Sequence, residues 1–200
     1  MINNEAKCPP PPTHSTREGW LHAAAVALEP LFAANDGQYP DKYRVSCGFP
    51  GGGNRLKRIG ECWYSSASAD ASVEIFISPV LADHARVMDV LAHELVHASL
   101  PVGAKHGAPF RRLARAIGLA GKPAATVAGP AFTASIQPIL AALGPYPHAA
   151  MGLASQSKKQ TTRMHKCVCP ECGYTARTTR KWLDDVGAPH CPTHGQMEVA

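Results

Sequence analysis

The sequence is organised around one stretch, Val87-Met88-Asp89-Val90-Leu91-Ala92-His93-Glu94-Leu95-Val96-His97-Ala98. Residues four apart on an α-helix lie one turn apart on the same side, so His93 and His97 would face the same way. Two imidazoles on one helix face can hold a zinc ion, and Glu94 beside them can act on a zinc-bound water. The stretch therefore predicts a catalytic metal site carried by a helix.

The surroundings of this stretch also favour a helix. Asp83 is suited to be its N-cap, and apolar residues recur at helical spacing after it. Pro101 and Gly103 would end the helix, which we expect to run from about Asp83 to Ser99. The alternative interpretation is an ordinary amphipathic helix with two surface histidines.

A catalytic zinc ion usually has three protein ligands and one water, so a third ligand is needed. No Asp or Glu occurs between Glu94 and Glu171, which excludes a nearby downstream carboxylate. His106 is the nearest downstream donor, and the glycines at 103 and 107 would let the chain turn back toward the helix. We therefore predict His93, His97 and His106 as the ligands of the catalytic zinc, with His148 as an alternative third ligand.

The remaining pattern predicts an α+β fold in which a small antiparallel sheet packs with helices. Helices are expected over 17–34, from Pro109 to about Gly118, and over part of 132–143, where Pro138 disturbs the start or the straightness. Strands are expected over 43–49, 59–64 and 73–77, ahead of the metal-binding helix. Residues 1–16 read as a disordered lead-in without a secretion signal.

Composition narrows the class of protein further. The chain has 200 residues, of which 45% are hydrophobic, enough for one medium domain and a small appendage. No run of residues approaches the length of an apolar membrane span, so we expect no membrane partner. Four of the seven cysteines lie in the last 34 residues, which is typical of a metal site in a reducing compartment. We therefore expect a cytoplasmic protein. It would be associated with the nucleoid if it is bacterial, and it would act in the host cytoplasm if it is encoded by a phage.

Charge is distributed unevenly along the chain. Residues 1–94 carry 8 Lys and Arg against 11 Asp and Glu, whereas residues 95–170 carry nine cations and no acid. Because surface charges normally mix in sign, such a stretch indicates a polyanionic partner, and DNA is the leading candidate. The alternative is a basic surface without a partner.

The last residues contain a second metal-binding pattern. Cys169 and Cys172 form a CxxC pair, Cys191 and His194 form a CxxH pair, and 18 residues lie between the two pairs. Four ligands of this kind close a structural zinc site in small modules that cannot bury enough core alone. We predict a zinc ribbon over 166–200 with these four ligands, and Cys167 as a spare cysteine.

The predicted ribbon also carries basic and aromatic residues. The segment from Tyr174 to Trp182 is β-prone. Its cationic side chains could contact phosphates, and its aromatic rings could stack on unpaired bases. Trp182 could equally belong to the core of the ribbon. The candidate nucleic-acid contacts across the chain are Arg111, Arg112, Arg115, Lys158, Lys159, Arg163, Arg177, Arg180, Lys181 and Trp182.

Together these residues resemble the SprT-like family, which includes the Spartan proteases, and the layout is similar to its short bacterial or bacteriophage members. The resemblance covers roughly residues 17–200 and rests on His93-Glu94-Leu95-Val96-His97-Ala98, on His106-Gly107 with Phe110, and on the cysteine-rich tail. It implies a zinc metalloprotease domain, with zinc ligands at 93, 97 and 106 and a catalytic glutamate at 94. It also implies binding to DNA and degradation of proteins trapped on it, which is a role in DNA repair.

The sequence as a whole predicts four segments: a lead-in over 1–16, a metalloprotease domain over 17–147, a basic linker over 148–165 and a zinc ribbon over 166–200. The predicted function is hydrolysis of peptide bonds, with one catalytic and one structural zinc ion, on protein substrates that include DNA-bound ones. The main alternative is a nucleic-acid-binding adaptor, in repair or transcription, whose protease-like domain is inactive. A zinc hydrolase acting on another bond is a third possibility.

Hydrolysis of a peptide bond also needs a group that stabilises the oxyanion formed from the carbonyl oxygen. The candidates are Tyr64, Tyr146 and the arginines at 111, 112 and 115.

Overall fold

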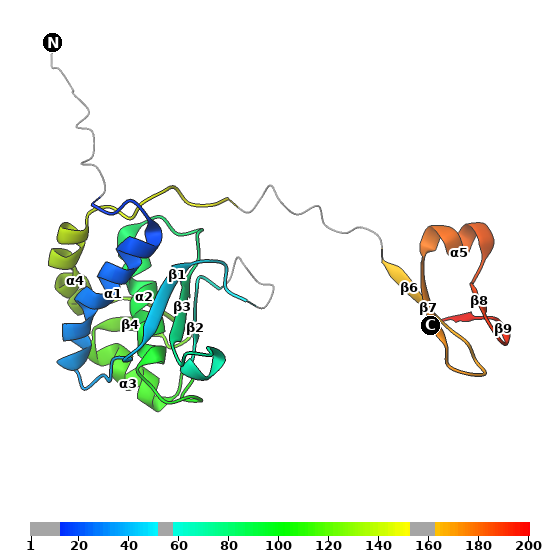
Figure 1. Ribbon diagram of the computed structural model, residues 1–200, viewed down its shortest axis with the longest axis horizontal. Helices are drawn as coiled ribbons and strands as arrows, with labels where there is room; N and C mark the ends of the chain where they lie inside the picture. The colour runs from blue at the N-terminus through cyan, green and yellow to red at the C-terminus, as the bar shows by residue number, and fades with distance from the viewer. Residues whose placement is uncertain (1–12, 52–57, 153–162) are drawn as a thin grey trace, which may run out of the picture. The chain divides into compact units, whose positions relative to one another are not determined.

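The computed structural model describes residues 13–51, 58–152 and 163–200, which divide into two compact units, Met1–Leu153 and Ala154–Ala200 (Figure 1). The first unit contains α1 (Arg17–Ala33), β1 (Tyr43–Cys47), β2 (Gly60–Trp63), the short 3-10 helix η1 (Ser65–Ala67), β3 (Val73–Ile77), α2 (His84–Ala98), α3 (Ala108–Ala116), β4 (Leu119–Lys122), β5 (Ala125–Ala128) and α4 (Pro130–Leu143). The mixed α+β class is as predicted from the sequence.

The main sheet is mixed, which corrects the prediction of an antiparallel sheet. Its strand order is β1-β3-β2, with β2 antiparallel and β1 parallel to β3. The physical reason is the burial of β3, whose alternate residues Val73, Ile75 and Ile77 are all buried. The most apolar strand takes the central position, and β1 and β2, which flank it, therefore do not pair with each other.

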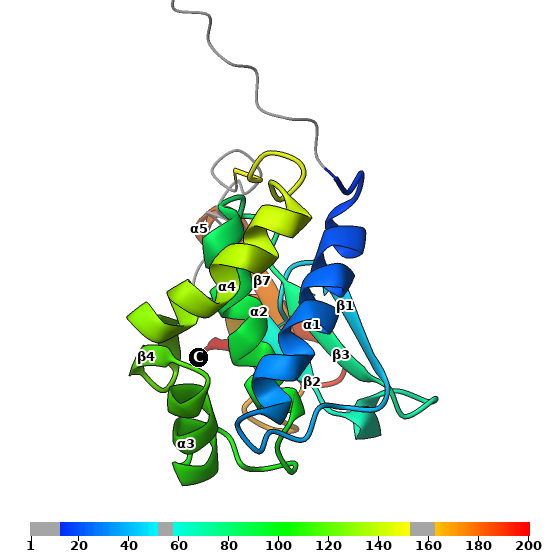
Figure 2. The same cartoon turned by 90° about the vertical axis from the view of Figure 1, so that its left-hand side faces the viewer.

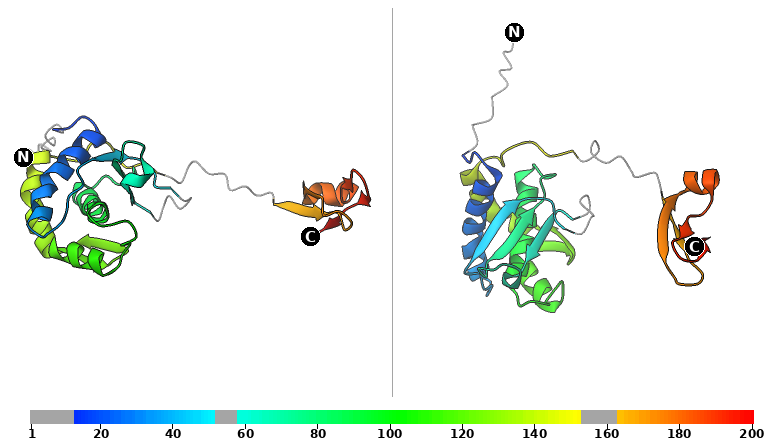
Figure 3. Two further views of the ribbon diagram at one scale, coloured as in Figure 1. Left: turned by 60° about the horizontal axis from the view of Figure 1, so that its bottom comes forward. Right: turned by 45° about the vertical axis from the view of Figure 1, so that its right-hand side comes forward.

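Helices α1 and α2 pack against the face of the sheet that carries these buried residues (Figures 1 and 2). Helix α1 begins after Thr16, whose hydroxyl accepts a hydrogen bond from the Gly19 amide at 3.1 Å. It buries Trp20, Leu28 and Phe32 completely. Helix α2 begins after Asp83, as predicted, and contacts α1, α3, α4, the sheet and β5, so it runs through the core of the unit (Figure 3).

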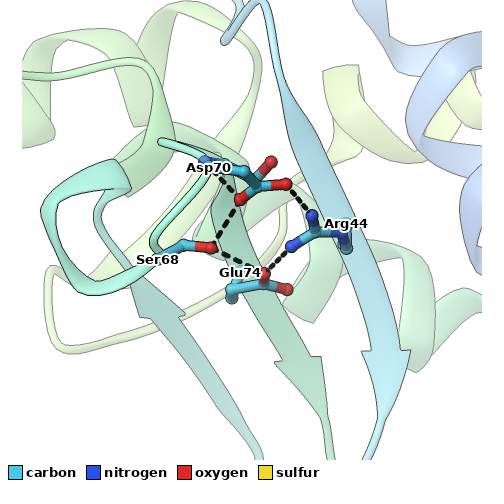
Figure 4. Close-up of polar contacts among 5 residues, drawn as sticks. Arg44, Ser68, Asp70 and Glu74 are labelled. Carbon is cyan, nitrogen blue, oxygen red and sulfur yellow. Dashed lines mark hydrogen bonds and ion pairs between the residues drawn. The ribbon is translucent and has the colours of Figure 1, made fainter.

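The opposite face of the sheet carries a polar cluster (Figure 4). Arg44 on β1 forms ion pairs with Glu74, its register partner on β3, and with Asp70 in the preceding loop. Ser68 donates a hydrogen bond to Asp70 at 2.7 Å, and this bond, with those from Ser72 and the charge of Arg44, lowers the pKa of Asp70. The cluster connects the β2–β3 loop to β1.

A β-hairpin, β4–β5, follows α3 and was not predicted from the sequence. Its strands pair antiparallel from Leu119 with Ala128 to Lys122 with Ala125. The strands have four residues each and are rich in alanine and glycine, so they carry little β propensity. Helix α4 then begins at Pro130, earlier than expected, and continues through Pro138.

The second unit contains β6 (Met164–Val168), β7 (Thr175–Thr179), α5 (Arg180–Val186), β8 (His190–Cys191), β9 (Gly195–Gln196) and β10 (Glu198–Val199). Strands β10, β6 and β7 form one antiparallel sheet and β8 and β9 another. The β-prone segment predicted from Tyr174 to Trp182 is only partly a strand, because Arg180 starts a helix. The i,i+4 ion pair between Arg180 and Asp184 favours that helix.

Part of the predicted lead-in and linker lies outside the described residues, namely 1–12 and 153–162, and with it Lys158 and Lys159. The first residues of the predicted linker pack on the first unit. Arg17 donates hydrogen bonds to the carbonyls of Pro147 and Ala149, and the Met151 amide donates to the Pro79 carbonyl at 2.9 Å. None of the helices in the described ranges has the length and apolar character that crossing a bilayer requires.

Candidate metal centres

Three predicted histidine ligands come together at the C-terminal half of α2. His93 and His97 lie one turn apart on the helix, and the turn after α2 brings His106 back to them. Two residues of this turn have a positive φ: Gly103 at 93° and Lys105 at 44°. Gly107 instead has an ordinary extended backbone and acts as the N-cap of α3.

The Nε2 atoms of the three imidazole rings lie close together. The Nε2 atoms of His97 and His106 are 3.1 Å apart, and those of His106 and His93 are 3.4 Å apart. The closest ligand atoms of the three residues all lie within 4.8 Å of one another, so they could hold a metal ion. His148, the alternative third ligand, is not in this group and borders a different cavity, which Arg17 and Cys47 also line.

Two further residues hold these rings in place. Phe110, the buried aromatic residue of α3, has its ring centroid 4.5 to 4.9 Å from the centroids of all three imidazoles. Thr126 on β5 is buried, and its Oγ1 is hydrogen-bonded to Nδ1 of His93 at 2.7 Å. A proton on Nδ1 that is donated to Thr126 leaves the Nε2 lone pair free for a metal ion.

The hairpin that carries Thr126 is itself attached to α2. Arg86 donates hydrogen bonds to both carboxylate oxygens of Asp89, at 2.8 and 2.9 Å, and to the Thr126 carbonyl at 3.5 Å. Asp89 also accepts a hydrogen bond from the Ala128 amide at 3.2 Å. The position of Thr126 relative to His93 therefore depends on contacts between β5 and the first two turns of α2.

The electrostatics of the site keep the imidazoles neutral. Burial lowers the pKa of His93 to about 3, with smaller contributions from His97, His106 and Arg86. Burial and His106 lower the pKa of His97 to about 4, and burial lowers the pKa of His106. All three rings are therefore unprotonated at neutral pH, which is the form that binds metals.

Glu94 lies beside this group in the same cavity. The cavity has a volume of about 640 Å³ and is bordered by β2, α2, the turn with His106 and the hairpin. Glu94 is only 6% exposed. Burial raises the pKa of Glu94 to about 8, and Glu61 adds to the rise while Arg58 opposes it. An open cavity thus contains three neutral imidazoles and a carboxyl group with high proton affinity.

Among the candidates for stabilising an oxyanion, only Tyr64 borders this cavity within the described part of the chain. Tyr146 is buried and does not border the cavity; its ring stands edge-on to that of Trp20, with the centroids 5.1 Å apart. Arg111, Arg112 and Arg115 are exposed on α3, away from the cavity. The structure thus reduces the candidates to Tyr64.

The second group of potential ligands is in the C-terminal unit. Cys172 Sγ and Cys191 Sγ are 3.7 Å apart, and Nδ1 of His194 lies 3.6 Å from Cys191 Sγ and 3.8 Å from Cys169 Sγ. The four side chains form one cluster that could hold a metal ion. Cys167 is outside this cluster and completely buried in the small core of the unit.

The predicted nucleic-acid contacts are exposed where the structure describes them: the three arginines are on α3 of the first unit, and the other described contacts are in the second unit. Lys166 on β6 is the register partner of Arg177 on β7. Trp182 is 51% exposed, with the Lys181 ammonium 5.0 Å from its ring centroid, so it is not buried in the core of the unit. Arg163 is exposed just before β6, and Arg180 is paired with Asp184.

Sequence reasoning missed several residues of the first centre: Gly60, Cys62, Arg86 and Thr126. They border the cavity from β2, from the start of α2 and from the hairpin. The Gly-Lys-Pro-Ala turn over 121–124 was the available sign of a hairpin. No local pattern says that Thr126 reaches His93, because 33 residues separate them.

These features define an α+β protein with a candidate metal centre of three histidines, two on α2 and one in the turn that follows it, and a second cluster of three cysteines and one histidine. The chain belongs to the SprT-like family, whose profile matches residues 28–129. The matched range includes β1 to β5 and both helices that position the histidines. The C-terminal unit lies outside it. No curated protein and no solved structure matches the chain.

The contact between Thr126 and His93 leads to a testable expectation for metal binding. Thr126→Val keeps the shape of the side chain but removes the hydrogen bond to Nδ1, so the His93 ring loses its fixed tautomer. We expect the affinity of the histidine centre for Zn²⁺ or Co²⁺ to fall about 10–100-fold. Competition with a chelator would measure this, with Co²⁺ absorption separating the histidine centre from the thiolate cluster. Thr126→Ser, which keeps the hydroxyl, is the matched control, and equal affinities for all three proteins would contradict the expectation.

Proposed function

We propose that this protein is a DNA-associated zinc metalloprotease that hydrolyses peptide bonds. One observation carries the proposal: three neutral imidazoles converge within an open cavity that also holds the carboxyl group of Glu94. A buried metal site used only for stability would need neither the cavity nor a carboxyl group of high proton affinity. Membership of the SprT-like family, which is associated with zinc metalloprotease-like function, supports the same conclusion.

The geometry of the histidine group fits zinc. Tetrahedral coordination with Zn–N distances of 2.0–2.1 Å separates two ligand nitrogens by about 3.3 Å. The Nε2–Nε2 distances of 3.1 Å between His97 and His106 and 3.4 Å between His106 and His93 lie on either side of this value. Three neutral histidines also leave one tetrahedral position open, which is typical of catalytic rather than structural zinc sites.

The cysteine cluster fits a structural zinc ion. Zn–S distances of about 2.3 Å in a tetrahedral site separate two sulfurs by about 3.8 Å. The distance between Cys172 Sγ and Cys191 Sγ is 3.7 Å. With four protein ligands the coordination is complete, so we assign this cluster to the folding of a zinc ribbon rather than to catalysis.

A zinc ion held by the three histidines would supply Lewis acidity, which lowers the pKa of water and polarises a carbonyl group. Glu94 would act as the general base, taking a proton from the attacking water on a carboxylate oxygen and then delivering it to the leaving amine nitrogen. Burial raises the pKa of Glu94 to about 8 in the metal-free site, and the positive charge of a bound zinc ion would favour the ionised carboxylate that accepts the proton. Tyr64, the remaining candidate at the cavity, would donate a hydrogen bond to the developing oxyanion.

The proposed association with DNA rests on charge. Lys166 and Arg177 are register partners on exposed positions of β6 and β7, and like charges placed directly opposite each other destabilise a sheet. A phosphate backbone would neutralise this repulsion. Trp182 and Tyr174 are about half exposed in the same unit and could stack on unpaired bases. By analogy with the family, the substrates would include proteins bound or crosslinked to DNA.

The decisive experiment combines metal analysis with a cleavage assay. We expect two zinc ions per chain, and cleavage of a peptide library or of DNA-bound proteins that increases when DNA is added. The adaptor alternative predicts DNA binding without cleavage under any condition. A hydrolase of another bond predicts cleavage of ester or amide compounds but not of peptides.

The exposed pair of cations, Lys166 and Arg177, leads to a second expectation, about the salt dependence of DNA binding. For duplex DNA, each phosphate contact contributes about 0.9 to the magnitude of the slope of the logarithm of the association constant against the logarithm of the salt concentration. Replacing both Lys166 and Arg177 by glutamine should therefore reduce the magnitude of the slope by about 1.8. Fluorescence anisotropy at several salt concentrations measures it, with Lys42→Gln as the control at an exposed lysine in the acidic part of the chain. An unchanged slope would show that this pair does not contact phosphates.

A further inference from the structure

Gly60, the first residue of β2, lies where the strand crosses α2. Its register partner is Ile77, whose side chain faces the helices, so Gly60 also faces them. The residue borders the same cavity as Val90 and Glu94. Val90 and Glu94 are four residues apart on α2, and the backbone of Gly60 fits between their side chains.

A side chain at this position would collide with the carboxyl group of Glu94. A Cβ atom built on Gly60 would lie 2.5 Å from Glu94 Oε1, 2.7 Å from Val90 Cγ1 and 3.0 Å from Glu94 Cγ. Ordinary non-bonded contacts between carbon atoms are about 3.5–4.0 Å. Val90 and Glu94 are 5% and 6% exposed, and the Glu94 carboxylate is the far end of the longer and more flexible side chain, so it is the group that would move.

Other glycines near the sheet do not have this constraint. A Cβ on Gly48 would meet Phe76 Cδ1 at 3.3 Å, and one on Gly51 would first meet Glu61 at 3.5 Å. The next inward-facing residue of β2 is Cys62, whose pKa Glu94 helps to raise, so its thiol is also close to this carboxyl group. The side of β2 that faces Glu94 therefore consists of one residue without a side chain and one small residue.

We propose that Gly60 is a positioning residue for Glu94: its bare backbone forms the wall that holds the carboxylate in its working position. The catalytic meaning of this contact rests on the function proposed above. Because the three atoms nearest to a Cβ at residue 60 belong to Glu94 and Val90, a substitution here should displace the general base without removing the metal site.

Kinetics test the functional part of the proposal. For zinc-loaded Gly60→Ala we expect kcat to fall about 100-fold, as for other small displacements of a reacting group. The KM should stay within about twofold, because a group acting in the chemical step rather than in binding changes kcat. Zinc content and the Co²⁺ spectrum should match the wild type, and Gly48→Ala should keep the wild-type kcat. A wild-type kcat for Gly60→Ala would overturn the proposal.

A stability cycle tests the contact without any catalysis. We would measure Tm for the wild type, Gly60→Ala, Glu94→Ala and the double variant. If the added methyl group collides with Glu94, Gly60→Ala should lower Tm less in the Glu94→Ala background than in the wild type. Additive changes in Tm would overturn the proposal. If Gly60→Ala does not fold alone, the same cycle in the Val90→Ala background removes the second collision and leaves the one with Glu94.

These two readouts separate this proposal from the proposed function. A wild-type protein that binds zinc but cleaves no peptide would contradict the proposed function, and the Tm cycle would still decide whether Gly60 determines the position of Glu94.

Discussion

Replacing Glu94 by glutamine is expected to lower kcat for peptide hydrolysis by about 10²–10⁴-fold, the usual contribution of a general acid–base. Glutamine has nearly the same shape as glutamate but cannot accept the proton from water at neutral pH. The amide also removes the buried carboxyl group, whose pKa of about 8 shows that the ionised form is disfavoured there before a metal ion binds. We therefore expect the variant to fold as well as the wild type.

The measurement is cleavage of a peptide substrate by zinc-loaded protein, together with zinc content and Tm. Zinc content should be unchanged, because the proposed ligand atoms belong to His93, His97 and His106. His97→Ala is the informative comparison, since it should lose both cleavage and the metal ion of this centre. Equal cleavage by the wild type and Glu94→Gln would exclude Glu94 as the general base and would favour a mechanism without it.

Removing the metal from the cysteine cluster is expected to unfold the C-terminal unit while the first unit stays folded. Among residues 163–200, the apolar core of the C-terminal unit contains four buried residues, three of them cysteines, with only two partly buried neighbours. Domains below about 40 residues usually need a metal or disulfides to be stable. Zinc contributes about 10–16 kcal/mol of apparent binding free energy in zinc-finger peptides at pH 7, which is available here for folding.

The first unit is expected to fold without a metal ion, because its core includes the large buried side chains of α1, the sheet and α2. NMR spectra recorded with excess chelator should therefore lose the dispersed resonances of residues 163–200 and keep those of residues 13–152. Cys172→Ser should have the same effect without chelator, whereas Cys167→Ala, outside the ligand group, should keep the metal. A C-terminal unit that remains folded in chelator would contradict the assignment of a structural zinc site.

The sequence predicted the most local features of the protein well. The bounds of β3 and the N-cap of α2 are confirmed, and α1 agrees to within one residue at its end. These features depend on hydrophobic spacing, on capping and on turn residues within a few positions, and such interactions are encoded by adjacent residues. The pairing of His93 with His97 is of the same kind, because helix geometry alone puts them on one face.

Features that join distant segments were predicted poorly. The parallel pairing of β1 with β3 was missed because strand order depends on which strand is buried most, and this is a property of the whole core. The β4–β5 hairpin has weak local propensity and is stabilised by contacts with α2, including those from Asp89 and Arg86. The start of α5 at Arg180 was missed because β-prone and helical signals overlap there.

The sequence by itself determined the chemical groups of both candidate centres, because the spacing of His93, Glu94 and His97, and of the paired cysteines, is a matter of local chain geometry. Only the tertiary structure decided how these groups are held. It brings Phe110 against the rings of all three histidines, Thr126 to the imidazole of His93, and Gly60 against the carboxyl group of Glu94. The contacts with Thr126 and Gly60 join residues more than 30 positions apart, and packing of the β5 hairpin and β2 on α2 creates them.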